Sequence, residues 1–413
     1  MYINNLLKYR EMAETCARCG YCRDMVRSRD NTYDVCPLRG STAGFDLYTA
    51  RGKNWIVRLL IEHIINPDDI TDEASEIIYS CTLCGNCTTH CLILKPDSWS
   101  NFPANKFNDH LINNNEINIG LRSVLVNNNK APKKIQEVLQ NFYLYGNALG
   151  LSAEKGMEWS KGLKLKYAGK DKSDTLLYIG TVASYYKENY AGLISIVNLL
   201  KKAEVDFVVL DSPLDSGGDI RELGEEALFE EFARRNLELF KQFGIKRIIT
   251  VSPHDYNAFK NYYPKVLGKD WEEANITVYH YTEFFNLLIK SGKLKINKKF
   301  DLKFTYHDPC KLGRINDIYE EPRSIIASLG SLKEMELNRE NSYCCGGGGG
   351  GLWYETSKPS RMQDKRVKQA IQTGADVLVT ACPTCKIMLE NGLKNINGKI
   401  MIKDIAEVLN EAT

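Results

Sequence analysis

Short apolar runs and one helical repeat give the first outline of the fold. The stretches KFTYHD (303–308) and ADVLVTA (375–381) are rich in apolar, aromatic and β-branched residues, which is typical of buried strands. Between residues 50 and 65, apolar positions recur at helical spacing in ARGKNWIVRLLIEHII, which predicts an amphipathic helix. A further helix is expected in CPTCKIMLENGL, because Pro383 fits the first turn of a helix.

A similar succession of strands and polar positions occurs between residues 174 and 290. Three apolar runs there, DTLLYIG, DFVVLD and IKRIITV, predict strands. The polar residues after these strands repeat the spacing of five cysteines further along the chain, with 33, 35 and 2 intervening residues against 33, 36 and 2. The aligned positions are Thr181 with Cys310, Asp215 and Ser216 with Cys344 and Cys345, and Ser252 and Asp255 with Cys382 and Cys385. We interpret this spacing as an internal duplication whose first copy lacks all five thiolates.

The polar residues of the first copy allow two interpretations. In one, they fill the space that lost ligands have left. In the other, the carboxylates of Asp215 and Asp255 and the imidazole of His254 bind a hard metal ion. Polar filling is the simpler interpretation and the one adopted.

Composition narrows the class of protein. The chain has 413 residues, of which 43% are hydrophobic and 26% charged, and its formal net charge is +2. So balanced a charge gives no basis for nucleic acid as a partner. The best apolar candidate, WIVRLLIEHII, is too short and too charged to span a membrane, and the N-terminus lacks the layout of a signal peptide. We therefore expect a cytoplasmic protein, which can also lie peripherally on the inner face of the membrane.

The thirteen cysteines are clustered, which indicates metal ligands rather than disulfides in a reducing compartment. Two runs, CARCGYC from residue 16 and CTLCGNC from residue 81, each hold three cysteines at two-residue gaps and are followed by a distal cysteine. In two-cluster ferredoxins the distal cysteine of each run ligates the other cluster. We therefore expect one [4Fe–4S] cluster on Cys16, Cys19, Cys22 and Cys91 and a second on Cys81, Cys84, Cys87 and Cys36. A pair of zinc sites is the alternative, although zinc prefers ligands grouped as two pairs.

The remaining cysteines form a third group near the C-terminus, beside the predicted strands and helix: Cys310, Cys344, Cys345, Cys382 and Cys385. Thiolates at the start of a helix feel its positive end, which lowers their pKa and favours metal binding. Six glycines follow the adjacent pair. The first two, Gly346 and Gly347, let the backbone approach a bulky cofactor and donate N–H groups to it. A flexible glycine linker after two unrelated cysteines is the alternative.

In this order and at these gaps, the single cysteine, the cysteine pair and the closing Cys-Pro-x-Cys resemble the CCG domain, or cysteine-rich domain, of heterodisulfide reductase. HDPCKLGR and ACPTCK match that family closely. A ferredoxin-like domain followed by two CCG domains is similar to the D-subunit of the membrane-associated enzyme. It also resembles the iron–sulfur subunits of glycolate, lactate and anaerobic glycerol-3-phosphate dehydrogenases. The resemblance covers nearly the whole chain.

The resemblance implies a mixed α+β and α/β fold in four parts. These are a helical ferredoxin-like domain for two [4Fe–4S] cubanes (1–120), a helical linker (121–172), a CCG domain without ligands (173–297) and an intact CCG domain (298–413). In the family, an intact CCG motif carries a noncubane [4Fe–4S] cluster on its five cysteines, which here are Cys310, Cys344, Cys345, Cys382 and Cys385. Cys344 and Cys345 would hold the reacting position, with Gly346 and Gly347 lining the cofactor. The full heterodisulfide reductase uses two facing noncubane clusters, whereas this chain has ligands for one.

The resemblance implies an iron–sulfur oxidoreductase subunit. It would pass electrons between a thiol/disulfide-type site at the noncubane cluster and a partner, through the two cubanes. The alternative is an electron conduit of a flavin dehydrogenase for a 2-hydroxy acid, glycerol 3-phosphate or an acyl-CoA, which feeds a quinone. Either function implies partner subunits, a flavoprotein or a membrane cytochrome or quinone subunit. His307, Lys311 and Arg314 are candidates for contacts with an anionic substrate, although a histidine before Asp-Pro is more often a structural hydrogen-bonder.

Overall fold

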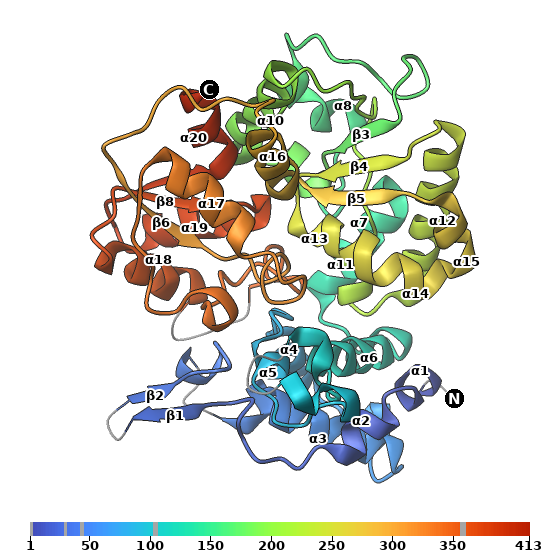
Figure 1. Cartoon of the computed structure of the whole chain (residues 1–413). Coiled ribbons are helices and arrows are strands. Elements are labelled where there is room, and N and C mark those ends of the chain that lie inside the picture. The colour runs from blue at the N-terminus through green and yellow to red at the C-terminus, as the bar shows by residue number, and fades with distance from the viewer. Residues whose placement is uncertain (1–2, 29–30, 42–44, 102–105, 356–360) are drawn as a thin grey trace.

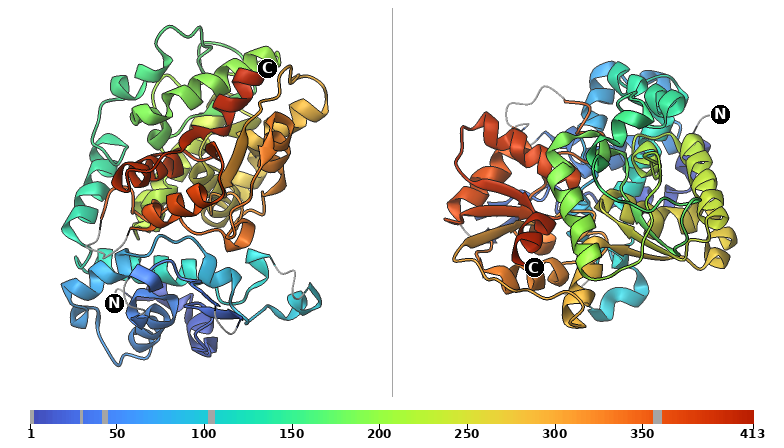
Figure 2. Two further views of the ribbon diagram at one scale, coloured as in Figure 1. Left: turned by 90° about the vertical axis from the view of Figure 1, so that its left-hand side faces the viewer. Right: turned by 90° about the horizontal axis from the view of Figure 1, so that it is seen from above.

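The computed structural model describes residues 3–28, 31–41, 45–101, 106–355 and 361–413. The chain folds into a helical N-terminal part and two α/β parts, which lie side by side above it in Figure 1. Figure 2 shows from the side that the N-terminal part runs beneath the α/β parts. The mixed fold expected from the sequence is confirmed at this level.

Short helices and one hairpin make up the N-terminal part. The helix expected for residues 50–65 is confirmed as α3 (Ala50–Ile61), which buries Val57, Leu60 and Ile61. Strands β1 (Met25–Ser28) and β2 (Asn31–Tyr33) pair antiparallel. The other helices are α1 (Asn4–Leu7), α2 (Arg10–Thr15), α4 (Asp72–Tyr79) and α5 (Asn86–Thr89). Loops between these elements carry most of the cysteines of this part.

Three helices lead from the N-terminal part into the first α/β part: α6 (Asn114–Asn127), α7 (Lys133–Tyr145) and α8 (Ala153–Gly156). Helix α6 is buried from Asn114 to Leu125, although about half of its residues are polar. Polar groups inside a protein need internal partners. Glu116 accordingly pairs with Arg221 of the first α/β part, at 2.5 Å between carboxylate and guanidinium. Helix α6 thus joins the two parts.

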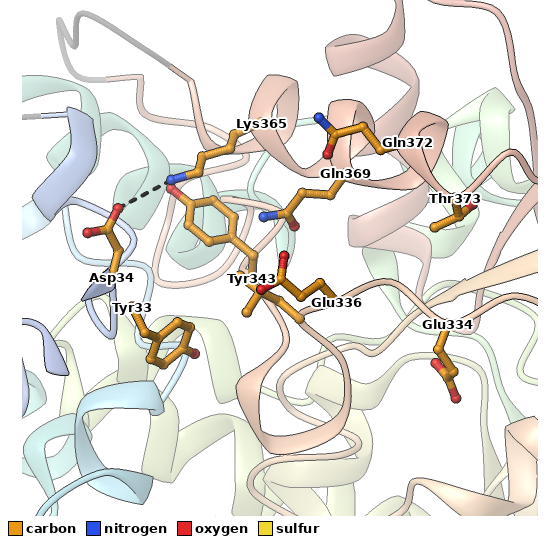
Figure 3. A pocket seen from close by; sticks show the side chains of 10 residues that line it. Tyr33, Asp34, Glu334, Glu336, Tyr343, Lys365, Gln369, Gln372 and Thr373 are labelled. Atoms are coloured by element: carbon orange, nitrogen blue, oxygen red, sulfur yellow. Dashed lines mark hydrogen bonds and ion pairs between the residues drawn. The ribbon is translucent and has the colours of Figure 1, made fainter. Parts of the chain in front are cut away.

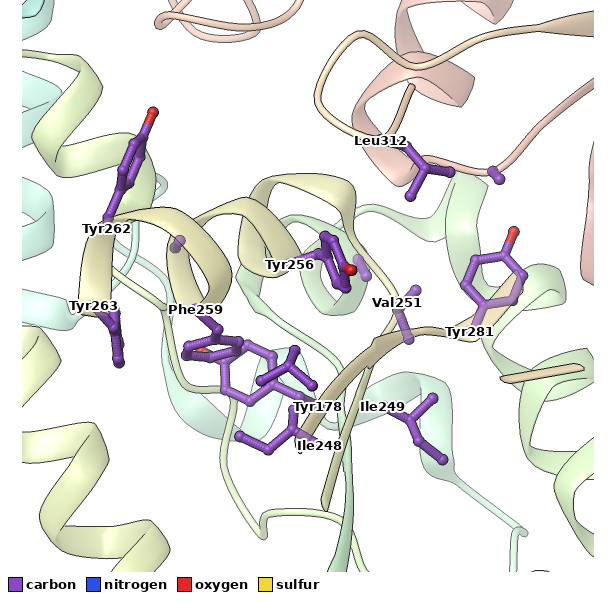
Figure 4. Close-up of a cluster of buried hydrophobic side chains, with 14 of the residues drawn as sticks. Tyr178, Ile248, Ile249, Val251, Tyr256, Phe259, Tyr262, Tyr263, Tyr281 and Leu312 are labelled. Atoms are coloured by element: carbon purple, nitrogen blue, oxygen red, sulfur yellow. The ribbon is translucent and has the colours of Figure 1, made fainter. Parts of the chain in front are cut away.

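The first α/β part holds a parallel sheet in the order β3-β4-β5, from β3 (Thr175–Tyr178), β4 (Arg247–Thr250) and β5 (Thr277–His280). Strands β3 and β4 confirm two of the expected strands. The third, in DFVVLD, is reduced to isolated backbone bridges from Val208, which pairs with Leu176 of β3, and from Val209. Aromatic rings fill the core against this sheet (Figure 4), where Phe259 meets Tyr178 edge to face at 4.9 Å between ring centroids.

Many short helices surround the first sheet. They are α9 (Thr181–Tyr185), α10 (Tyr190–Lys202), α11 (Gly218–Glu222), α12 (Glu226–Gln242), α13 (Pro253–Asn257), a π-helical turn (Ala258–Tyr262), α14 (Tyr263–Leu267), α15 (Lys269–Ala274) and α16 (Tyr281–Lys290).

The second α/β part holds a parallel sheet in the order β7-β6-β8-β9. The two central strands, β6 (Lys303–His307) and β8 (Val377–Thr380), confirm the buried strands expected from the sequence. The edge strands β7 (Ser331–Leu332) and β9 (Met401–Asp404) are short and partly exposed. Its helices are α17 (Glu320–Leu329), α18 (Met362–Gln372), α19 (Pro383–Asn395) and α20 (Ile405–Ala412).

The two sheets share one strand order, and the two α/β parts pack against each other. If the bridge at Val208 is counted as a strand position, each sheet runs second-first-third-fourth in chain order. Helix α10 of the first part packs on α20 of the second. Tyr281 directly follows β5, and Asp404 is the last residue of β9. Across this interface, the phenol of Tyr281 donates a hydrogen bond of 2.7 Å to the carboxylate of Asp404.

Candidate metal centres

Four cysteines from distant parts of the sequence line one cavity of the N-terminal part; we call them the inner cysteine group: Cys36, Cys81, Cys84 and Cys87. Cys36 reaches the cavity because Asn86 of α5 holds the segment before it. The Asn86 amide donates to the carbonyl of Val35 and to the hydroxyl of Tyr33, both at 2.7 Å. Lys53 and Asn54 of α3 line the same cavity, a role that the amphipathic pattern did not reveal.

Cys91 lies beside the first cysteine triplet rather than its own. Burial and the neighbouring thiols of Cys16 and Cys19 raise the pKa of Cys91 to about 11. We call Cys16, Cys19, Cys22 and Cys91 the outer cysteine group, because Cys19 is exposed to solvent. None of the thirteen cysteines, all of which are described, forms a disulfide. This spatial grouping has the crossed form that the spacing predicts, while ligation itself stays a prediction.

The third group converges at the carboxyl ends of β6 and β8; we call it the CCG site: Cys310, Cys344, Cys345, Cys382 and Cys385. Cys382 caps α19, where its Sγ accepts from the backbone N–H of Cys385 at 3.4 Å, and Pro383 takes the first turn as expected. The Sγ atoms of Cys345 and Cys385 are 3.3 Å apart. Hydrogen bonds from the thiols of Cys344 and Cys385 lower the pKa of Cys345 well below its usual range. Thiols packed this closely form a donor set suited to a soft metal centre.

His307 acts in the structure as a buried hydrogen-bonder of the CCG site. The guanidinium of Arg366 donates to His307 Nδ1 at 3.0 Å, so the ring proton must sit on Nε2. The ring also hydrogen-bonds Cys345, and burial lowers the pKa of His307, which keeps the ring neutral. The sequence offered no sign of Arg366, which lies 59 positions away and is fully buried.

Lys311 and Arg314 do not face an open pocket. Lys311 is 1% exposed and forms an ion pair with Glu222 of the first α/β part. Arg314 is 3% exposed and donates to the carbonyl oxygens of Cys84 at 2.9 Å and Ser342 at 2.6 Å. The suggestion that these two cations contact an anionic substrate is therefore not supported by their positions, because internal groups occupy both.

The glycine run packs directly on the backbone of the inner cysteine group and so brings the CCG site close to it. A Cβ on Gly348 would lie 2.6 Å from the carbonyl oxygen of Thr82, and one on Gly349 would lie 2.7 Å from that of Cys81. No side chain fits at such a separation. The run is thus a packing surface of fixed shape rather than a linker. The backbone N–H of Gly346 also donates to the Sγ of Cys344 at 3.3 Å.

Gly347 has a different environment from Gly346. A Cβ at Gly347 would meet the Thr384 methyl at 2.6 Å and Met388 at 2.9 Å, so this glycine packs on α19. Its expected role beside a cofactor stays a prediction.

Cys344 is the point at which the inner cysteine group and the CCG site meet. The hydroxyl of Thr82 lies 3.3 Å from its Sγ, across 262 positions of sequence. The thiol of Cys84 also hydrogen-bonds Cys344, which raises the pKa of Cys84 together with burial. One ligand candidate of each group is therefore in direct contact with the other.

In the first α/β part, four of the five residues aligned with the cysteines hydrogen-bond each other in pairs. Thr181 donates from its hydroxyl to Asp215, which also accepts from the backbone N–H of Gly217 at 2.8 Å. Asp255 accepts a hydrogen bond from Ser216. Burial, together with the charge of Asp219, raises the pKa of Asp215 to about 6.

His254 belongs to a different set from the one considered above. It pairs through Nδ1 with Asp219 at 2.9 Å, and Glu222 lies close to both. Among the described residues, Asp215, Asp255 and His254 are not found as a group with metal-ligand spacing. Polar filling of the ligand positions is the interpretation that this arrangement favours.

Two pockets open near the CCG site. One, of about 370 Å³, lies where the β1–β2 hairpin meets α18. Lys365 of α18 pairs with Asp34 there at 3.3 Å, and Figure 3 shows this pair beside Tyr343. The other, of about 300 Å³, is lined by Thr82, Gly346, Met388 and polar residues of α18 and α19. Because Thr82 and Gly346 both contact the Sγ of Cys344, the second pocket lies next to the CCG site, whose Cys344 is itself buried.

Comparison with known families defines the class of protein. Residues 12–93 match the 4Fe-4S dicluster domain, and residues 304–390 match the cysteine-rich domain, CCG. The chain therefore combines a 4Fe-4S dicluster domain with a cysteine-rich domain. Among the described residues, no helix is long and apolar enough to cross a membrane.

Several characterised or named proteins are similar to the chain. It is 32% identical to a probable iron–sulfur-binding oxidoreductase of Bacillus subtilis, over 83% of this chain and 48% of that protein. It is 33% identical to the EtfAB:quinone oxidoreductase of Syntrophomonas wolfei, over 81% of this chain and 46% of that protein. It is 27% identical to the D-subunit of the dihydromethanophenazine:CoB–CoM heterodisulfide reductase of Methanosarcina barkeri, over 97% of this chain and 93% of that protein. The resemblance to the D-subunit is confirmed, and the chain spans about half the length of the first two relatives.

Proposed function

We propose that this chain is the iron–sulfur electron-transfer subunit of a redox complex. The outer and inner cysteine groups would each hold a [4Fe–4S] cubane, and the CCG site would hold one noncubane [4Fe–4S] cluster. One observation carries the proposal: the three groups form a continuous series in space. The outer thiol of Cys22 neighbours Cys87 of the inner group, and Cys84 of the inner group contacts Cys344.

The residues around the CCG site suit an electron-rich, sulfur-bridged cofactor. The Gly346 N–H and the His307 ring approach Cys344 and Cys345, and such donors to sulfur raise the potential of an iron–sulfur centre. When bound, the clusters supply one-electron transfer. The protein residues orient the thiolates, exclude water and fix the separation between the groups.

We also propose that the first α/β part is a CCG domain that has lost its ligands. The two sheets share one strand order, and the five aligned positions gather in space but carry hydroxyls and carboxylates. The ranges 1–120, 121–172, 173–297 and 298–413 serve as the working domain boundaries. Helix α6 runs across residue 120, so the first two of these ranges form one packed body.

The noncubane cluster is proposed as the site where a thiol/disulfide pair exchanges electrons. Reduction of a disulfide breaks its S–S bond and takes two electrons and two protons to give two thiols. The electrons would come singly from a partner subunit through the two cubanes, and the protons from solvent. The pocket lined by Thr82 and Gly346 would bring a small molecule next to two residues that contact Cys344.

A second candidate function is an electron conduit for a flavoprotein. The similarity to an EtfAB:quinone oxidoreductase favours it. In that case the CCG site would exchange electrons with a flavin partner, and a quinone-reactive subunit would complete the path. Both candidates place the chain in a multi-subunit complex, on the inner face of the membrane when a membrane subunit is the partner.

The proposal is tested on the full chain purified without oxygen. Iron analysis should give about twelve irons per chain, from three four-iron clusters. Oxidation in the presence of a thiol should produce a paramagnetic signal distinct from the two reduced cubanes. A colourless, zinc-loaded chain would contradict the proposal. Turnover of a disulfide by the assembled complex, against turnover with a reduced flavoprotein alone, decides between the two candidates.

A further inference from the structure

Three buried cations surround the inner cysteine group without a carboxylate partner. Lys53, Arg122 and Arg314 are 2%, 0% and 3% exposed. Among the described residues, none of the three forms an ion pair with a carboxylate. This is unusual, because a charge buried without a counter-charge is strongly unfavourable.

Each of these cations is held by backbone carbonyl oxygens. The ammonium of Lys53 donates to Tyr48 at 2.6 Å and Leu47 at 3.2 Å, and the side chain lines the cavity of the inner group. The guanidinium of Arg314 donates to the carbonyl of Cys84 at 2.9 Å.

Arg122 connects all three parts of the protein. Its guanidinium donates to the carbonyl oxygens of Cys81 at 2.6 Å, Glu222 at 2.8 Å and Gly349 at 2.9 Å. Carbonyl dipoles orient a cation but do not neutralise it. The charge of Glu222 does reach Arg122, but that carboxylate is already paired with Lys311. The positive charges of Lys53, Arg122 and Arg314 therefore exceed the carboxylate charge paired with them.

The outer cysteine group has a different electrostatic environment. Arg23 pairs with Asp24 at 2.9 Å and is one-third exposed, and Arg58 pairs with Glu62 at 2.6 Å. Arg18 stacks over the ring of Trp55, which is itself 37% exposed, beside the exposed Cys19. Water and carboxylates screen these cations, so they contribute little to the potential at the outer group.

We propose that Lys53, Arg122 and Arg314 are the counter-charges of the inner cubane and set its reduction potential above that of the outer cubane. This inference rests on the proposed function, because it requires a cluster on the inner group. Four thiolates around a [4Fe–4S] core carry net negative charge, and reduction adds one more negative charge. Unscreened cations beside the cluster stabilise the reduced form most.

The direction of electron flow follows from this order of potentials. With this order of potentials, an electron that entered at the outer group would pass favourably to the inner group, whose Cys84 contacts Cys344. The three cations are positioning residues: they act through the cluster and touch no substrate.

The test is a redox titration of the full, anaerobically purified chain, followed by electron paramagnetic resonance. In Lys53→Met, the midpoint potential of the inner cubane should fall. At the wild-type midpoint, the ratio of reduced to oxidised inner cubane should then be about tenfold lower, which corresponds to a midpoint about 59 mV lower for a one-electron couple. Arg314→Gln should shift the same cubane in the same direction, and Lys53→Arg should restore the wild-type ratio. A Cys91→Ala variant, which loses the outer cubane, identifies the inner signal.

Lys95→Met is the matched control. Lys95 also donates to a backbone carbonyl, that of Asn108 at 2.7 Å, but it is exposed, so both cubanes should keep their potentials. If Lys53→Met lost the inner cubane, the potential of that cubane in Arg314→Gln would decide the inference. Two intact cubanes with unchanged potentials in Lys53→Met and Arg314→Gln would overturn the inference. Absence of a second cubane from the wild-type chain would instead overturn the proposed function.

Discussion

The two α/β parts share one strand order but carry different side chains at the ends of their strands. At the strand ends of the second part, five thiols converge, and Cys345 and Cys385 lie 3.3 Å apart. At the corresponding ends of the first part, Thr181, Asp215 and Gly217 are linked by hydrogen bonds. The contrast teaches that the strand order positions the ligands but does not require them, because hydroxyls and carboxylates satisfy one another in the same space.

The largest expected effect comes from removing a thiol of the CCG site. In Cys345→Ser, iron should fall from about twelve to about eight atoms per chain, because one four-iron cluster is lost. The thiol-dependent paramagnetic signal and turnover of the complex should disappear, while both cubanes still reduce. Ser216→Ala, at the aligned position of the first part, is the control and should leave the iron content unchanged. Full turnover in Cys345→Ser would mean that the CCG cluster is only structural.

A second large effect tests the crossed arrangement of the N-terminal part. Cys36→Ala should damage the cubane on Cys81, Cys84 and Cys87, because Cys36 lines their cavity. About four irons should be lost, and the signal of the outer cubane should persist in the electron paramagnetic resonance spectrum. Loss of the outer cubane instead would show that Cys36 serves its own triplet.

A smaller effect concerns the contact between the glycine run and the inner group. Gly349 has a φ of +57° and no room for a Cβ beside the carbonyl of Cys81, whereas Gly244 has a φ of +69° and open space. An alanine at either position carries the strain of a positive φ. The difference in stability between the two variants therefore measures the steric clash at Gly349 alone. Gly349→Ala should lower the free energy of unfolding by about 1–3 kcal/mol more than Gly244→Ala. Equal values in denaturant titrations under anaerobic conditions would contradict the close contact.

The smallest effect is a pH dependence in the first part. Burial raises the pKa of Asp215 from 3.8 to about 6, so the native carboxyl keeps its proton to a higher pH than the unfolded one. Its contribution to stability is therefore fully present below about pH 4 and is lost as the pH rises through about 6.

Asp215→Asn should remove this loss, which amounts to about 1–3 kcal/mol between pH 4 and 7. The measurement compares the free energy of unfolding of the variant and the wild type from about pH 5 to 7.5. Asp211→Asn, at an exposed position, is the control. A pH slope of Asp215→Asn equal to that of the wild type would show that Asp215 is ionised in the native state.

Local patterns predicted part of the secondary structure. Strands β6 and β8 and helix α3 followed from their apolar runs. Strands β5 and β9 were missed because they alternate weakly and are partly exposed, and DFVVLD forms only isolated bridges.

The candidate site divides in the same way. Cysteine spacing is local, so the three groups could be anticipated. The contacts of Thr82 with Cys344 and of Arg366 with His307 join positions 262 and 59 residues apart, and no spacing rule reaches across them. The sequence also could not predict that backbone carbonyl oxygens hold Lys53 and Arg122, because only the fold shows that neither side chain forms an ion pair with a carboxylate.

The most direct test of the central claim is anomalous diffraction at the iron absorption edge from crystals of the anaerobically purified chain. We expect three iron sites: one beside Cys19, one in the cavity of Cys36 and Cys81, and one beside Cys344 and Cys345. Iron beside Thr181 and Asp215, or no iron at Cys344, would contradict it.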